Sequence, residues 1–402
     1  MRARDLGLRI GHLAPGPLGS ITDVAGVRVG HSTIVEGSGD LVTGKGPVRS
    51  GVTVVVPHDG DPFGEAVFAG AHRLNGNGEL TGLEWIREAG LLSSPIAITN
   101  THSVGIVRDA LVAVAARSAA AAESAWSLPV VGETWDGWLN DIDGQHVTAS
   151  HLVGALDEAT GGPVEEGNVG GGTGMICHRF KGGIGTSSRR LGADEGGFTV
   201  GALVQANYGR RERLAIDGVP VGREIGFDLV PSDREGMASD PADADAGSII
   251  VVLGTDAPLL PHQCERLAQR AGLGVARTGG AGEHASGDLF IAFATGNRGL
   301  VAGDRSHGRP FARQLSALDD AWISPLFWAA IEATEEAIVN ALVAAETMTG
   351  HSGHVAHRLP QDRLVEVWRR HRGQAGKSGC AARRAQGTAR IDSPDRASRR
   401  GT

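Results

Sequence analysis

The junction between residues 247 and 248 places the tightest constraint on how this chain can fold. Before it, residues 231–246 are acidic and rich in Pro, Gly and Ala, a composition typical of a solvent-exposed linker. After it, Ser248 leads directly into the apolar run 249–253, which predicts a buried strand. A loop that is open to cleavage must therefore end, within one residue, at a strand of the hydrophobic core.

Ser248 gains unusual chemistry if the chain is cut at this junction. Cleavage of the Gly247–Ser248 bond would create an N-terminus that carries a hydroxyl and an α-amine on the same residue. Such an amine has a pKa near ~8, so an appreciable fraction is neutral and basic at pH 7. The residue would then be a nucleophile with its own base.

Composition excludes several classes of protein. The chain has 402 residues, 41% of them hydrophobic and 21% charged, which fits a soluble globular protein with one large α/β domain or two average domains. Its 61 glycines follow no fixed period, which excludes collagen and predicts many tight turns and close backbone contacts. The three cysteines lie far apart without a CxxC spacing, which argues against a disulfide framework or a zinc knuckle.

The N-terminus has no apolar signal core, and no run approaches the ~18 uncharged apolar residues of a membrane helix. We therefore expect a cytoplasmic protein that makes no use of a membrane. The chain carries a net charge of −8, yet residues 369–402 hold ten Lys and Arg against two Asp. Because this end is rich in Ser, Gly and Ala and lacks interleaved aromatics, we expect a disordered basic tail at 374–402 rather than a nucleic-acid-binding segment.

Apolar runs predict strands at 51–57, 95–100, 130–135, 198–207, 248–253 and 289–294. Apolar residues at helical spacing predict helices at 83–89, 104–121, 148–159, 259–271 and 324–349. The two kinds of element are mixed without a strict βαβ rhythm. We expect a mixed α/β (α+β) fold with sheets inside and helices outside.

The common cofactor motifs are absent. The glycine-rich loop 167–174 lacks the GK[ST] ending of a phosphate-binding loop, and the fifteen histidines show no metal-ligand spacing. We expect no cofactor and no metal.

Polar side chains at strand ends are the candidates for chemistry. Ser286 and Asp288 lie two residues apart at the leading end of the strand 289–294, so they point to the same side. Gln205 and Asn207 end another strand on one face, where an amide can donate to a developing oxyanion. Glu133 ends a third strand beside an acidic loop that contains Asp136, Asp141 and Asp143, a cluster that could bind an ammonium group. Taken singly, each group is equally typical of a turn or a solvated surface.

Together these residues form an ordered set that resembles a known family. The run Gly-Ser-Ile-Ile-Val-Val-Leu-Gly-Thr-Asp-Ala-Pro-Leu-Leu-Pro-His-Gln over 247–263 closely resembles the self-cleavage site of the DmpA-like D-aminopeptidases and β-peptidyl aminopeptidases. Further runs that resemble the family are found at 132–136, 139–142, 169–174, 205–209, 286–288 and 340–348. The resemblance extends over about residues 8–370.

The resemblance implies a four-layer αββα sandwich similar to that of N-terminal-nucleophile hydrolases, with different connectivity. Residues 1–373 would form one peptidase domain, self-cleaved into an α chain 1–247 and a β chain 248–402. Relatives release N-terminal residues from short peptides, amides and esters, some with a preference for D- or β-amino acids. They use no metal and form homo-oligomers of cleaved αβ heterodimers, which suggests a tetramer here.

The resemblance also implies a role for each candidate. Ser248 would be the nucleophile, Ser286 and Asp288 would polarise and orient it, and Asn207 would hold the oxyanion. Glu133 would bind the free amino group of the substrate, and Trp135 would line the pocket beside it. Self-cleavage would begin when the Ser248 hydroxyl attacks the unshielded Gly247 carbonyl.

Two alternatives remain from the sequence. One is an acyltransferase of similar fold, such as an ornithine acetyltransferase, although those enzymes usually carry a threonine nucleophile where this chain has Ser248. The other is a non-catalytic relative that binds a small molecule.

Overall fold

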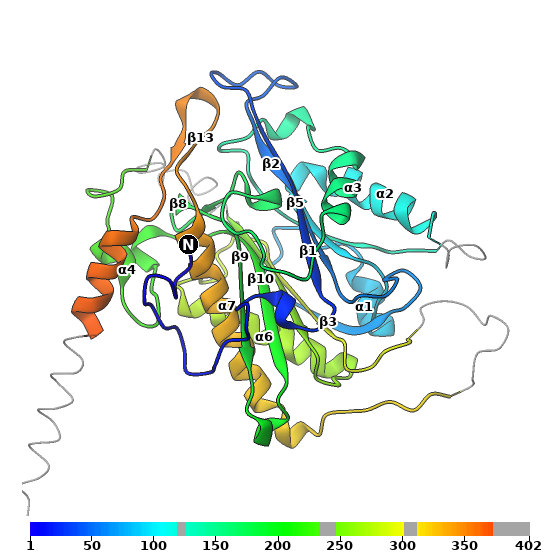
Figure 1. Cartoon of the computed structure of the whole chain (residues 1–402). Helices are drawn as coiled ribbons and strands as arrows, with labels where there is room; N and C mark the ends of the chain where they lie inside the picture. The colour runs from blue at the N-terminus through cyan, green and yellow to red at the C-terminus, as the bar shows by residue number, and fades with distance from the viewer. Residues whose placement is uncertain (119–125, 233–246, 301–311, 373–402) are drawn as a thin grey trace, which may run out of the picture.

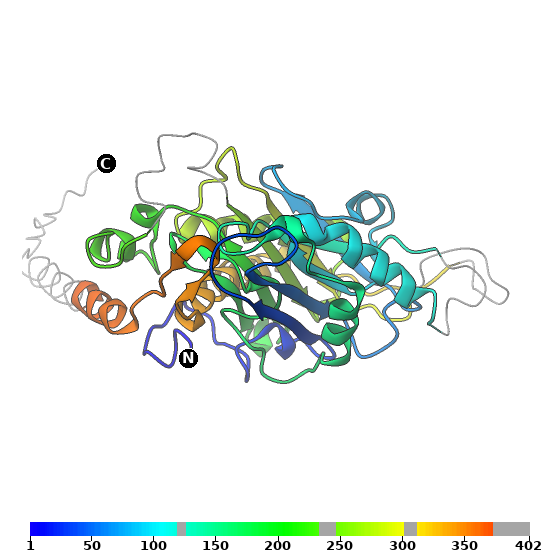
Figure 2. The same ribbon diagram turned by 90° about the horizontal axis from the view of Figure 1, so that it is seen from above.

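The chain is a stack of four layers, seen in the computed structural model from two directions in Figures 1 and 2. The structure describes residues 1–118, 126–232, 247–300 and 312–372. A four-stranded and a six-stranded sheet pack face to face, and helices cover the outer face of each sheet. The αββα sandwich expected from the sequence is confirmed.

The larger sheet has the strand order β4-β3-β12-β11-β10-β9. Its strands are β3 (Val67–Arg73), β4 (Leu91–Leu92), β9 (Gly183–Arg190), β10 (Thr199–Asn207), β11 (Ser248–Thr255) and β12 (Asp288–Ala294). β11 lies at the centre, antiparallel to β10 and parallel to β12.

The smaller sheet has the strand order β1-β2-β5-β6. Its strands are β1 (Arg28–Glu36), β2 (Val48–Val56), β5 (Ile96–Asn100) and β6 (Val130–Thr134). Two short hairpins lie outside the sheets, formed by β7 (Ile176–Cys177) with β8 (Phe180–Lys181) and by β13 (Met348–Thr349) with β14 (Val355–Ala356).

The long helices α6 (Pro261–Arg277) and α7 (Ser324–Ala344) cover the larger sheet. The smaller sheet is covered by α2 (Val104–Ala115) and α3 (Ala149–Asp157). Two shorter helices, α1 (Leu83–Ala89) and α4 (Val221–Glu224), lie in connections, and residues 361–372 are helical.

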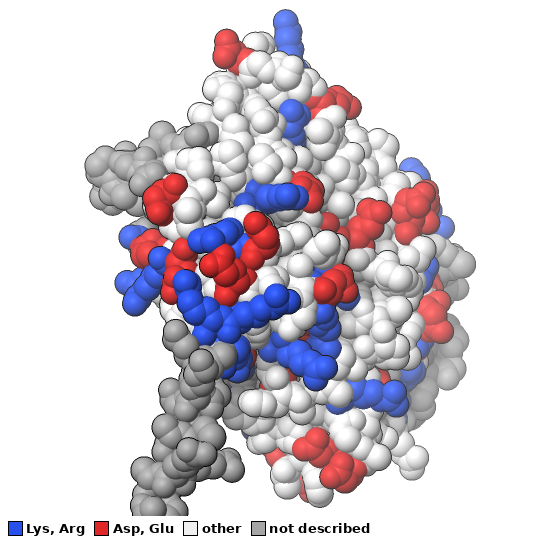
Figure 3. Space-filling model, turned by 60° about the vertical axis from the view of Figure 1, so that its left-hand side comes forward, with Lys and Arg blue, Asp and Glu red and all other residues white. Residues whose placement is uncertain are grey.

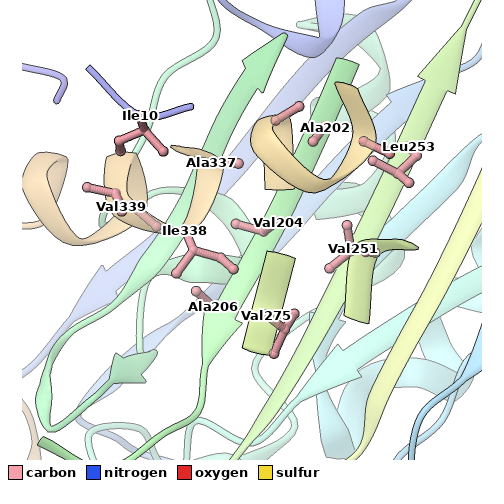
Figure 4. Packing of buried hydrophobic residues seen from close by; sticks show 14 of the residues in the cluster. Ile10, Ala202, Val204, Ala206, Val251, Leu253, Val275, Ala337, Ile338 and Val339 are labelled. Carbon is pink, nitrogen blue, oxygen red and sulfur yellow. The ribbon is translucent and has the colours of Figure 1, made fainter. Parts of the chain in front are cut away.

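Strand β11 is apolar throughout because it is buried on both faces. Val251 and Leu253 face α6 and α7 in the cluster of Figure 4, whereas Ile250 and Val252 belong to the core between the two sheets. Side chains alternate along a strand, so neighbouring residues serve opposite cores. This double burial is why the run after Ser248 shows no polar alternation.

Three helix ends differ from the predictions. The helix expected over 104–121 ends at Ala115. The helix expected to end near Gly272 continues to Arg277, and the one expected to reach residue 349 stops at Ala344, with Met348 in a hairpin instead. The extension follows from packing between helices. A Cβ at Gly274 would lie 2.8 Å from the backbone oxygen of Ile331 on α7, so the missing side chain allows the two helices to touch.

The predicted linker 231–246 lies outside the described residues from 233 onward, and so does the predicted tail 374–402. The residues just before the tail are ordered. Trp368 is buried in the core, and Arg370 pairs with Glu224 at 2.6 Å. On the face shown in Figure 3, acidic and basic side chains are interspersed rather than separated.

Within the described part of the chain, no helix has both the length and the apolar character to cross a membrane.

Candidate active site

Ser248 is the first residue of β11 and is only 5% exposed. Its ladder partner on β10 is Asn207, and its Oγ accepts a hydrogen bond of 3.0 Å from the backbone N–H of Gly287. Gly247 is held tightly before it, since a Cβ there would lie 2.7 Å from the Asn207 carbonyl oxygen. The predicted scissile bond therefore sits at the edge of a rigid, buried ladder.

Ser286 and Asp288 point to the same side, as their spacing predicted, and lie next to Gly287 and Ile249 beside this serine. The Ser286 hydroxyl donates to Asp288 Oδ1 at 2.5 Å. Burial raises the pKa of Asp288 to about 6, while the hydrogen bonds from Ser286 and from the Ile249 N–H act to lower it. Both residues line a narrow recess together with Gly247.

Asn75 supports this pair and was not identified from the sequence. Its Oδ1 accepts from the Asp288 N–H at 2.5 Å, and its Nδ2 donates to the Glu283 carbonyl at 2.8 Å. The Asn- and Gly-rich stretch around it predicted only an irregular loop. Asn side chains that bond to the backbone are typical of such loops, and this is the signal that could have pointed to Asn75.

Asn207 is fixed at both ends of its amide. Its Oδ1 accepts from the Ile176 N–H at 2.8 Å, and its Nδ2 donates to the Trp135 carbonyl at 2.9 Å. An amide nitrogen carries two protons, so one N–H remains for another acceptor. Gln205 differs, because its Nε2 gives its two protons to Thr99 O and Thr134 Oγ1 in the interior. Of the two predicted amides, only Asn207 can serve an oxyanion.

Glu133 lies near the end of β6 and is only 2% exposed. Its carboxylate accepts from the Glu79 N–H at 2.9 Å and from the Thr101 hydroxyl. Burial raises the pKa of Glu133 against these hydrogen bonds. A carboxylate with so few partners can gain much from a substrate ammonium group.

The loop after β3 connects Glu133 to the serine. A Cβ at Gly78 would lie 3.1 Å from Glu133 Oε1 and 3.0 Å from Gly287 Cα. Gly287 in turn donates its N–H to Ser248. Gly78 and Gly287 therefore lie between the Glu133 carboxylate and the Ser248 hydroxyl and bring the two groups into one neighbourhood.

The acidic cluster predicted around Glu133 does not form. Asp136 is buried and accepts from Ser50 and Asn140 at 2.7 and 2.9 Å. Asp141 caps the backbone of Gly44 and Gly46, and Asp143 pairs with His102 at the surface. These carboxylates are held by the protein itself, because the turn that follows β6 directs each to a different side. Glu133 is therefore the member of this predicted cluster that stays beside the loop at Gly78.

Trp135 contributes its backbone to the site, where its carbonyl accepts from Asn207. Its half-buried indole lies against Gly137, where a Cβ would be 2.5 Å from a ring carbon. Among the described residues, no group of three or more His, Cys, Asp and Glu side chains is arranged to hold a metal ion.

The chain is similar to known proteins over most of its length. Residues 19–356 match the model of peptidase family S58. The chain is 46% identical over 382 residues to the β-peptidyl aminopeptidase BapA of Sphingosinicella microcystinivorans, covering 92% of each chain. It is 45% identical over 378 residues to the BapA of Sphingosinicella xenopeptidilytica, covering 91% of this chain and 90% of the relative.

Solved structures agree in the fold. A β-aminopeptidase of a Burkholderia species superposes with a TM-score of 0.83 at 55% identity, covering 92% of this chain and 99% of that one. The L-aminopeptidase D-Ala-esterase/amidase of Ochrobactrum anthropi, described as a prototype serine aminopeptidase with a variant of the Ntn hydrolase fold, gives 0.82 at 43% identity, covering 92% and 98%. This chain therefore belongs to peptidase family S58 and is an aminopeptidase.

Proposed function

We propose that this aminopeptidase cuts its own chain between Gly247 and Ser248 and then uses Ser248 as its nucleophile. The observation that carries the proposal is the setting of the Ser248 hydroxyl at the buried start of β11, beside the Ser286–Asp288 pair. Because its oxygen accepts from the Gly287 N–H, its own proton is free to leave during attack.

Self-cleavage proceeds by an N→O acyl shift. Ser248 Oγ attacks the Gly247 carbonyl carbon, the C–N bond breaks, and the nitrogen gains a proton as the hydroxyl loses one. Water then hydrolyses the ester, which leaves a carboxylate on Gly247 and a free α-amine on Ser248. The close contact of Gly247 with the Asn207 backbone supports this step, since a side chain there would obstruct it.

The mature enzyme repeats this chemistry on its substrate. The α-amine of Ser248 takes the hydroxyl proton, Oγ forms an acyl-enzyme with the N-terminal residue of the substrate, and the leaving amine gains a proton. The remaining N–H of Asn207 binds the oxyanion. Ser286 and Asp288 orient the hydroxyl, and water releases the product.

Glu133 selects substrates that have a free amino group. A buried carboxylate near the nucleophile attracts an ammonium group and fixes the scissile carbonyl at a set distance from it. The substrates are short peptides, amides or esters, and D- or β-amino acids fall within the class. Trp135 lines the pocket beside Glu133. Two relatives are named β-peptidyl aminopeptidases, which supports this range.

The cleaved αβ units assemble into a homo-oligomer, for which we propose a tetramer, in the cytoplasm and without nucleic acid. Both helices over the larger sheet expose a large apolar side chain, Leu273 on α6 at 52% and Trp328 on α7 at 59%. Apolar side chains of this size on an outer face favour contact between subunits.

One gel tests the self-cleavage. Denatured wild-type protein should run as two chains of 247 and 155 residues, whereas Ser248→Ala should run as one chain of 402. Ser150→Ala, an exposed serine at the start of α3, is the matched control and should cleave normally. A wild-type chain that stays intact after long incubation would contradict both the cleavage and the nucleophile.

A further inference from the structure

Lys181 is a lysine buried completely beneath the site, and no step of the mechanism above uses it. Its Nζ donates to the carbonyl oxygens of Gly172 at 3.3 Å, Met175 at 2.8 Å and Gly182 at 2.8 Å. In the described part of the chain its ammonium forms no ion pair within 4.0 Å. Burial of a charge without a counter-charge costs free energy, so a lysine at this position points to a function.

The three carbonyls favour the charged form of this amine. An ammonium has three protons and satisfies three acceptors, whereas a neutral amine has two. Burial lowers the pKa of Lys181 to about 7, and the nearby Cys177 and Asp136 act to raise it. With a pKa of about 7, the amine is an ammonium below neutral pH and is partly charged at pH 7. The three carbonyl acceptors match the three protons of that charged form.

One peptide group connects this ammonium to Asn207. The Met175 carbonyl that accepts from Nζ belongs to the same peptide group as the Ile176 N–H, and that N–H donates to Asn207 Oδ1 at 2.8 Å. A positive charge at the oxygen of a peptide polarises it and strengthens the hydrogen bond that its N–H donates. The stronger hydrogen bond to Asn207 Oδ1 polarises the side-chain amide, and its N–H groups become better donors.

We propose that Lys181 is a positioning residue that polarises and orients the Asn207 amide for the oxyanion. The proposal rests on the oxyanion role of Asn207 stated above. The chain of contacts runs from the Lys181 ammonium through the Met175–Ile176 peptide to Asn207, whose free N–H then meets a negative oxygen in the transition state. The charge of Lys181 thereby acts on the reaction without contact with substrate.

The site should keep its shape when the charge is removed. The Met175 carbonyl also accepts from the Gly182 N–H at 2.8 Å, so the turn stays closed without the lysine. The β7–β8 hairpin is held independently by the buried Arg211, which donates to the carbonyls of His178 and Arg179. Methionine has nearly the length of the lysine stem, which makes Lys181→Met the variant of choice.

The first test compares turnover and transition-state binding. We expect Lys181→Met to lower kcat about 10-fold or more while KM changes less than about twofold, because the lost interaction acts on the oxyanion. The inhibition constant of an aminoalkylboronic acid, which forms a tetrahedral adduct with the serine, should rise by the same factor. Lys45→Met, at an exposed lysine, is the control and should match the wild type. An unchanged kcat, or an unchanged boronate affinity, would overturn the proposal.

Asn207→Ala separates this proposal from the one on which it rests. If Asn207→Ala slows self-cleavage and Lys181→Met does not, the oxyanion role stands and the role of Lys181 fails. If neither change slows it, the oxyanion role itself fails. When Lys181 acts through Asn207, the double variant cleaves no more slowly than Asn207→Ala alone, whereas additive losses would indicate separate roles.

A measurement on the wild type applies even if Lys181→Met does not fold. The chain has only three lysines, Lys45, Lys181 and Lys377, so ¹⁵N labelling of lysine gives three side-chain signals. One should be a slowly exchanging ammonium at pH 6, below the pKa of Lys181, and it alone should shift when the boronate binds. A neutral amine at that pH, or a signal that the boronate leaves unmoved, would contradict the proposal.

Discussion

At the scale of single residues, the site depends on carboxylates that burial makes costly to ionise. Glu133 and Asp288 are 2% and 1% exposed, and burial raises the pKa of both. They differ in their partners. Asp288 accepts from Asn75 and Ser286, whereas Glu133 accepts, among the described residues, from one backbone N–H and one hydroxyl. This contrast fits an orienting role for Asp288 and a substrate-binding role for Glu133.

Glu133→Gln should separate substrate binding from self-cleavage. The variant should still cut its chain, because the precursor presents no ammonium group, yet kcat/KM on free-amino substrates should fall roughly 10- to 100-fold with the lost charge-assisted hydrogen bond. The control is Glu79→Gln, whose exposed side chain lies next to the same loop. Wild-type activity that is equal on N-acetylated and free-amino substrates would contradict the role of Glu133.

The raised pKa of Asp288 predicts how activity depends on pH. Its carboxylate must be ionised to accept strongly from Ser286, so kcat/KM should rise with pH through a step near pH 6, the raised pKa of this group. A rate profile between pH 4.5 and 8 on an aminoacyl anilide measures the step. In Asp288→Asn the residual activity should lack it, and a step that persists in this variant would assign it to another group.

The same shift predicts the opposite trend for stability. A carboxyl whose pKa rises from 3.8 unfolded to about 6 folded binds its proton more tightly in the native state. Its contribution to stability is therefore largest below pH 3.8 and is lost as pH rises through 6. In thermal melts, the melting temperature of Asp288→Asn should rise relative to that of the wild type between pH 4 and pH 7. A difference in melting temperature that does not change with pH would exclude this account.

At the scale of elements, glycines set how closely helices approach each other and the sheets. A Cβ at Gly185 of β9 would lie 2.0 Å from the Ala337 oxygen of α7, and one at Gly70 of β3 would lie 2.2 Å from the Glu265 nitrogen of α6. These two strands were not predicted, because Gly and Ala weaken the apolar signal. Their role as contact points for helices appears only once the layers are stacked.

Two helical glycines should respond oppositely to alanine. Gly105→Ala in α2 meets nothing within 4 Å and should stabilise the fold by up to ~1 kcal/mol through helix propensity. Gly274→Ala in α6 would press on Thr334 at 2.6 Å, so it should cost about 1–3 kcal/mol through overpacking. Denaturant unfolding of both variants gives the two free energies. A Gly274→Ala variant as stable as Gly105→Ala would mean that the α6–α7 contact relaxes freely.

At the scale of the whole molecule, the two chains expected after self-cleavage are interleaved. Strands β11 and β12 from the second chain lie between β10 and β3 from the first. Arg189 of the first chain is fully buried and pairs with Glu332 at 3.1 Å and Glu336 at 2.6 Å on α7 of the second. We therefore expect cleavage to free one serine amine without loosening the fold.

The cleaved chains should co-elute in size-exclusion chromatography and separate only in denaturant. Arg189→Met should lower the stability by about 3 kcal/mol, because it removes the buried cation between two buried carboxylates. Glu336 would keep Arg4, and Glu332 would keep two backbone N–H donors. The midpoint of guanidinium unfolding measures the loss. Arg108→Met, at a side chain that is 37% exposed, is the matched control. If both changes lower the stability equally, the buried ion pairs do not stabilise the fold.

The sequence by itself determined the strands that bury both faces. It also predicted the junction at Ser248, and it placed Ser286, Asp288, Asn207 and Glu133 at strand ends, where the family resemblance gave them their expected roles. Those features are local: an apolar run, a two-residue spacing, a residue at a strand end. Only the tertiary structure decided that the Gln205 amide bonds to groups in the interior, and that Asp136 and Asp141 bond to the surrounding protein. It alone also placed Asn75 and Lys181 behind the site. Their partners are distant in sequence, and a hydrogen bond between distant residues exists only after the layers have packed.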